Sequence, residues 1–188
     1  MDVIPPLWLP IIVSAAAVFI LSSIIHMVLP YHKSDFRKLP REDDVREALR
    51  NSHVHEGEYM FPYATESKER NSKEFKDKMN NGPVGILAVF PSGPYNMGSS
   101  LIKWFLYCIV VSVFAAYVAG HALIPGAVFH SVFRYTGLVA FVGYGWALVQ
   151  DSIWFRKKWA TTFKFLIDGF IYALFTAAIF GLLWPATY

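Results

Sequence analysis

Four long apolar stretches constrain what this chain can fold into. Each contains about 20 residues or more, the length that an α-helix needs to cross the ~30 Å hydrocarbon core of a bilayer. Apolar residues make up 55% of the 188 residues and aromatic residues 17%, which is unusual for a soluble domain of this size. The sequence therefore predicts an all-α membrane protein with four transmembrane helices, within Leu7–Leu29, Leu101–Ile124, Phe133–Ile153 and Thr161–Leu183.

The positive charges predict how these helices are oriented. Of the 17 Lys and Arg residues, all but Arg134 lie in or beside the connection between the first two stretches or between the last two. Such residues are enriched in cytoplasmic loops. We therefore expect a protein of the inner (plasma) membrane with both termini outside and with residues 30–100 and the Arg156–Lys158 loop in the cytoplasm. No Lys or Arg precedes the first stretch, so we expect a retained helix rather than a cleaved signal peptide.

The polar segment 30–100 predicts a small α/β insert between helices one and two. It divides the chain into helix one (1–29), the insert (30–100) and a three-helix bundle (101–188). Acidic residues after Pro40 favour a helix start, with Val45 and Leu49 on one apolar face.

A second helix and two strands complete the predicted insert. Ser72 could cap the helix, and the strands are expected at Tyr59–Tyr63 and Val84–Phe90. A two-stranded sheet is marginally stable alone. We therefore expect the sheet to pack against the helices of the insert, the membrane domain or a partner.

Small residues spaced four apart predict where the helices pack. Transmembrane helices associate through close contact at such positions. Such rows of small residues, here called stripes, allow packing within one chain or between copies. Packing within the chain is favoured because each helix has three other helices as possible partners. The residues are Ser112, Ala116 and Gly120 in the second stretch, and Gly169, Ala173, Ala177 and Gly181 in the fourth.

Polar residues inside the apolar stretches are the candidate functional site, since burying them in a membrane is costly. They lie in the cytoplasmic third of the predicted bundle and could converge on one pocket. The candidates are His26, Gln150, Asp151, Lys164 and Asp168.

This polar set has two interpretations. Asp168 and His26 could titrate in a proton-linked or ligand-binding site. Alternatively, the set could be purely structural. Lys164 could extend its ammonium to the membrane interface, and Asp168 could be satisfied by Lys164, one turn away, and by neighbouring hydroxyls. The structural interpretation is favoured.

The other histidines predict neither a metal nor a cofactor. His121 and His130 lie near the outer face, where haem or pigment ligation is an alternative, and His26 lies at the opposite depth. His53 and His55 are alternate residues, so on a strand both imidazoles would lie on one face and could bind a metal. No third and fourth ligand follow at a usual spacing, however, and a solvated loop is favoured.

Composition and motifs exclude several function classes. The single cysteine, Cys108, allows no intramolecular disulfide and no thiolate cluster. The chain contains no HExxH, GxSxG, P-loop or GxGxxG motif, so no enzyme is predicted. Topology accounts for the net charge of +3, which therefore does not indicate a nucleic-acid partner.

The chain resembles a group of uncharacterised bacterial four-helix integral membrane proteins of similar length. The resemblance would span the whole chain and implies no activity, ligand or fold. It is carried by Ser22–His32, by Gly82–Gly85 together with Pro91–Pro94, by Asn96–Gly98 and by Asp151–Trp154.

These observations favour a non-catalytic accessory or scaffold subunit of a larger inner-membrane complex. Its expected partners are the lipid bilayer and other membrane protein subunits or further copies of itself. Two alternatives stay open: a small oligomeric transporter or channel subunit with a polar site near Asp168, and a haem- or pigment-binding membrane protein.

Overall fold

The chain is mostly helical, and its computed structural model describes residues 4–187. Four helical segments are long and apolar enough to cross a membrane, as predicted. The expected external position of Tyr188 lies outside the described residues. The four segments are Pro5–Met27, Met97–Ala122, Phe129–Trp154 and Trp159–Leu182.

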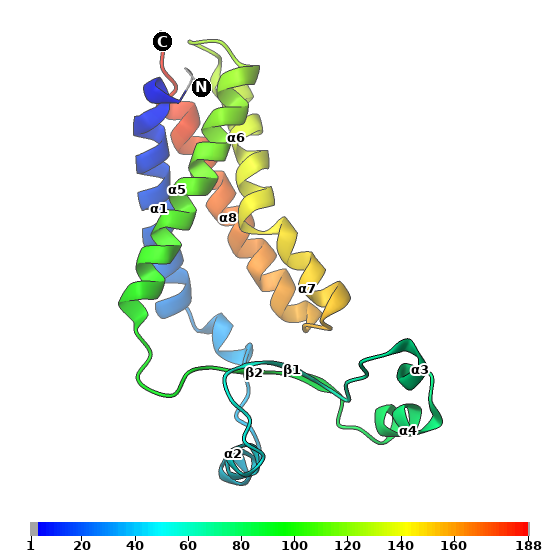
Figure 1. The fold of residues 1–188 in the computed structure, drawn as a ribbon. Coiled ribbons are helices and arrows are strands. Elements are labelled where there is room, and N and C mark those ends of the chain that lie inside the picture. Colours follow the sequence, from blue (N-terminus) through cyan, green and yellow to red (C-terminus); the bar gives the residue numbers. More distant parts are fainter. Residues whose placement is uncertain (1–3, 188) are drawn as a thin grey trace. The chain divides into compact units, whose positions relative to one another are not determined.

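These segments form the first of two compact units, which also holds the chain up to Phe36. Figure 1 shows α1 starting at the end of the bundle where α8 finishes. The indole of Trp184 donates to the Ile124 carbonyl there, at 3.1 Å. The helices are α1 (Trp8–Met27), α5 (Met97–Ala122), α6 (Phe129–Tyr144), α7 (Val149–Trp154) and α8 (Trp159–Leu182).

The third apolar segment, predicted within Phe133–Ile153, is confirmed as helical, but its helix is interrupted. α6 starts four residues earlier and ends at Tyr144, and a 3-10 turn leads into α7. At the break, a Cβ built on Gly169 of α8 would lie 2.7 Å from the Gly145 Cα. The two backbones therefore meet, and glycine at the meeting point is a common cause of a helix break.

The small-residue stripes lie between helices of the same chain. The Ser14 hydroxyl of α1 donates to the Ser112 hydroxyl of α5 at 3.0 Å, with Ala116 and Gly120 buried on the same face. On α8, Ala173 and Ala177 lie against Gly137 of α6, and Gly181 lies against the Phe129 ring. Intramolecular packing thus occupies both stripes.

The second unit, Arg37–Tyr95, contains the predicted helices and strands. The hairpin is antiparallel, with Tyr59 opposite Leu87. The Ser72 hydroxyl caps α4 by accepting from the Phe75 amide at 3.1 Å. An additional short helix precedes α4. The elements are α2 (Glu42–Asn51), β1 (Gly57–Phe61), α3 (Ser67–Arg70), α4 (Lys73–Asn81) and β2 (Gly85–Val89).

The boundaries of the insert differ from the expected positions 30 and 100. Residues 30–36 belong to the helical unit because Tyr31, His32 and Asp35 contact α8. At the other end, the Asn96 side chain caps α5 by accepting from the Ser99 amide at 3.2 Å, so this helix begins before Leu101.

Candidate functional site

A polar cluster joins α8 to the chain that follows α1. A 3-10 turn, Pro30–Ser34, places Tyr31 and His32 beside α8, and Asp35 follows directly. Proline at the start of the turn cannot continue α1 and has a fixed φ suited to the turn. Asp168 of α8 is 1% exposed, and its carboxylate contacts the side chains of Tyr31 and His32.

Asp168 is satisfied by residues that are far away in the sequence. The Tyr31 hydroxyl donates to its Oδ1. The His32 Nε2 lies 2.8 Å from its Oδ2. The expectation that Lys164 and nearby hydroxyls satisfy Asp168 is therefore wrong: the partners come from the turn after α1.

His32 bridges two carboxylates. Its Nδ1 lies 2.6 Å from Asp35 Oδ2, and its Nε2 faces Asp168. A neutral imidazole carries one N–H and can donate to one carboxylate, whereas the imidazolium donates to both. Both contacts are therefore hydrogen bonds only where the ring, or one of the two carboxyl groups, carries an additional proton.

Lys164 pairs with Asp35 and not with Asp168. Its Nζ lies 2.7 Å from Asp35 Oδ1 and also donates to the Ser34 hydroxyl at 2.8 Å and the Tyr31 carbonyl at 2.5 Å. Burial raises the pKa of Asp35, but hydrogen bonds from Lys164 and His32 and their positive charge outweigh burial and hold that pKa below its ordinary value.

His26 completes the cluster from the last turn of α1. Its ring lies beside the His32 ring, with centroids 4.3 Å apart, and its Nε2 lies 3.3 Å from the Tyr172 hydroxyl of α8. One ligand atom from each of His26, His32 and Asp168 lies within 4.8 Å of the other two. This potential ligand set was not expected from the sequence.

The structure brings together only part of the predicted polar set. His26, Lys164 and Asp168 belong to the cluster. Asp151 instead faces Lys157 at 3.6 Å, with both side chains partly exposed, and Gln150 is exposed. Sequence reasoning missed Tyr31, His32 and Asp35, although polar residues directly after a long apolar helix that ends at proline are placed to return to the bundle.

The remaining histidines do not join a ligand cluster among residues 4–187. His121 is exposed, and its Nδ1 lies 2.8 Å from the carbonyl of Tyr117, one turn earlier. His130 is exposed and contacts the Phe129 ring edge-on. His53 and His55 are also exposed.

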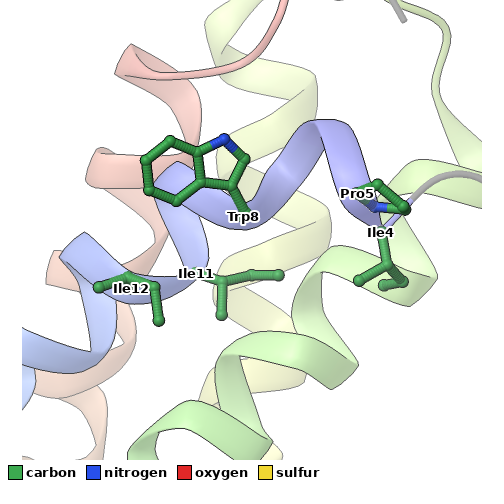
Figure 2. Close-up of a pocket in the computed structure, with 5 residues that line it drawn as sticks. All are labelled: Ile4, Pro5, Trp8, Ile11 and Ile12. Carbon is green, nitrogen blue, oxygen red and sulfur yellow. The ribbon is translucent and has the colours of Figure 1, made fainter.

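An apolar groove lies near the start of α1, far along the helix from the polar cluster. Figure 2 shows Trp8, Ile11 and Ile12 along the helix, with Pro5 and Ile4 ahead of it. None of these side chains is titratable or ligates a metal, so the groove offers contact area and no catalytic chemistry.

The second unit presents a different candidate surface. Its helices contain no buried residue, and all five residues of β1 are exposed. Large apolar side chains therefore stay uncovered. The exposed fractions are 37% for Val45, 51% for Met60, 69% for Tyr63 and 79% for Phe90.

No protein-family model, curated protein or solved structure matches this chain.

Proposed function

We propose that this chain is an accessory or scaffold subunit of a larger complex in the inner membrane. In this proposal, the four apolar helices span the membrane with both termini outside. The unit Arg37–Tyr95 lies in the cytoplasm, where it binds another protein of the complex. The distribution of Lys and Arg supports the orientation.

The observation that carries the proposal is a folded unit, Arg37–Tyr95, in which Ala64 is the only buried residue. α2 and α4 each have an apolar face, and yet neither buries a residue. A two-stranded hairpin needs a packed face to be stable, and short helices are marginal in water. A partner that covers Val45 on α2 and Met60 on β1 would supply the missing burial.

The chemistry of the unit favours a protein over an anionic lipid surface. Arg37–Tyr95 contains equal numbers of basic and acidic residues, whereas a segment that binds anionic lipid has a basic excess. Its exposed aromatic residues and methionines are types enriched at protein interfaces. The polar cluster would support this role by joining the chain that precedes this unit, residues 31–35, to α8.

Position-specific photocrosslinking in native membranes tests the proposal. A photoreactive residue at Val45 or Met60 should give an adduct with a discrete heterologous protein. The matched control is Glu47, which lies about 200° around the same helix from Val45. Equal adducts from both positions of α2, or adducts with lipid alone, would contradict the proposal. A protein that crosslinks at Val45 should also no longer copurify with the Val45→Asp variant.

A small oligomeric transporter or channel is the second candidate, because the third span is interrupted beside α8. Interrupted helices line substrate sites in many transporters. Mild extraction from native membranes separates the two candidates. A pure homo-oligomer with no Val45-specific crosslink would favour the transporter or channel.

A further inference from the structure

We propose that His26, His32 and Asp168 bind one divalent transition-metal ion at the end of the bundle where α1 finishes. The three side chains come from α1, from the 3-10 turn after it and from α8. Their ligand atoms lie within 4.8 Å of one another. The proposal is independent of whether the second unit binds a partner.

The donor set indicates the class of ion. Two imidazole nitrogens and one carboxylate oxygen suit Zn²⁺ and Fe²⁺, which take mixed nitrogen and oxygen ligands. Ca²⁺ and Mg²⁺ prefer oxygen ligands throughout. Three protein ligands leave at least one position for water or another ligand. Zn²⁺ is the probe of choice because it is redox-inert.

Two of the three ligand atoms, those of His32 and Asp168, need to move little to hold such an ion. Two ligands that lie about 2.0 Å from zinc at a tetrahedral angle are about 3.3 Å apart. The His32 Nε2 and the Asp168 Oδ2 are already 2.8 Å apart. A shift of about half an ångström between them would therefore replace the direct contact with two bonds to the metal.

The neighbouring residues match the outer shell of a metal site. Metal-binding histidines usually donate their other ring N–H to a carboxylate, which fixes the ring and its tautomer. The His32 Nδ1 lies 2.6 Å from Asp35, and this contact leaves Nε2 for the ion. The Tyr31 hydroxyl holds the other oxygen of Asp168 in the same way.

Charge and access also suit a cation. With neutral ligating histidines, the carboxylates of Asp35 and Asp168 outnumber the one ammonium, Lys164, so the cluster has a net negative charge. Both carboxylate side chains are at least 95% buried, a state that an added positive charge favours. His26 is exposed and gives the ion a way in.

Zinc titration of the full-length protein in detergent, purified without a histidine tag, tests the proposal. We expect one Zn²⁺ per chain, measured by elemental analysis after dialysis. His26→Ala removes the ligand at the exposed edge and leaves the His32 contacts with Asp35 and Asp168 in place. It should weaken binding at least 10-fold. Asp35→Asn should weaken binding by about 10–100-fold, because it changes only the residue that orients His32.

Matched histidine variants separate this site from adventitious binding. His55→Ala and His121→Ala remove exposed histidines in other parts of the chain and should leave zinc binding unchanged. Co²⁺ provides a second measurement, because its visible absorption reports the ligand set and should change in His26→Ala. Circular dichroism shows whether that variant keeps its helices, and His26→Gln replaces it if the helices are lost.

Several outcomes would overturn the proposal. These are an absence of stoichiometric Zn²⁺ or Co²⁺ in the wild-type protein, equal affinity in folded His26→Ala or His26→Gln, or an equal loss in His55→Ala or His121→Ala. In each case the cluster would be a hydrogen-bonded network only.

Discussion

The Lys164 ammonium lies 2.7 Å from the Asp35 carboxylate, although Asp168 is one turn away on its own helix. This ion pair links α8 to the segment that leads from α1 into the second unit. Asp168 reaches the same segment through Tyr31 and His32. Two positions on one helix therefore fix the point where the chain leaves the bundle.

Lys164→Met should destabilise the bundle. The change keeps most of the aliphatic stem and leaves the buried Asp35 carboxylate without its ammonium partner. Breaking a buried pair costs about 3–5 kcal/mol. Because the Lys164 side chain is 22% exposed, we expect about 2–3 kcal/mol, measured by unfolding in detergent.

The control for this pair is Lys157→Met. Lys157 and Asp151 are 3.6 Å apart, with side chains 36% and 42% exposed, so their pair should contribute less than about 1 kcal/mol. Adding Asp35→Asn to Lys164→Met should recover part of the loss, since the unpaired charge is gone. Equal losses for the two lysine variants would count against a structural ion pair at Asp35.

Gly169→Ala should destabilise the protein even though alanine favours helices. The added Cβ would lie 2.7 Å from the Gly145 Cα and 2.9 Å from its backbone nitrogen, and backbone atoms cannot easily move away. Overpacking of this kind costs about 1–3 kcal/mol. The melting temperature in detergent measures the effect.

Gly181→Ala is the matched substitution on the same helix. Its added Cβ would meet the Phe129 ring at 2.5 Å, but this partly exposed side chain can rotate. We therefore expect a smaller loss of stability than at Gly169. The reverse order would mean that the helices do not approach most closely at Gly145.

Hydropathy was sufficient to predict the four apolar helices, because a span needs a long uninterrupted apolar run wherever its neighbours lie. Local signals also predicted most of the insert: Ser72 caps α4 as expected. The break at Gly145 was not predictable in this way, since it depends on the approach of Gly169 from another helix.

The polar cluster was predictable only in part. Asp168 and His26 stand out because they interrupt apolar runs. The partners of Asp168 lie more than 130 residues earlier, in a turn that the sequence interpretation assigned to the insert. The partner of Lys164 was not predictable either. Helical spacing indicated Asp168 on the same helix, whereas Lys164 pairs with Asp35, which is distant in the sequence.

The proposed topology predicts which positions an impermeant thiol reagent can reach in intact cells. In a Cys108→Ser background, Ala186→Cys should be labelled from outside, and Arg70→Cys should be labelled only after permeabilisation. Both positions are exposed in the structure, so access to the reagent depends on the side of the membrane. Labelling of Arg70→Cys in intact cells would overturn the orientation inferred from the Lys and Arg residues.

Asp168→Asn and Asp168→Leu should differ sharply in stability. Asparagine can still accept from the Tyr31 hydroxyl with its carbonyl oxygen. Its amide can donate to the His32 Nε2, while the His32 Nδ1–H donates to Asp35. Leucine has a similar size but leaves the Tyr31 hydroxyl and the His32 Nε2 without their carboxylate partner. An unsatisfied buried polar group costs about 1–3 kcal/mol.

We therefore expect Asp168→Leu to be at least about 2 kcal/mol less stable than Asp168→Asn in detergent unfolding. The comparison separates the two roles of this carboxylate. Asp168→Asn should keep the bundle folded and yet bind zinc weakly, because an amide oxygen is a poorer ligand for Zn²⁺ than a carboxylate. If both variants were equally stable, the hydrogen bonds at Asp168 would contribute little to joining α8 to the chain after α1, and the ion pair of Lys164 with Asp35 would have to hold that segment alone.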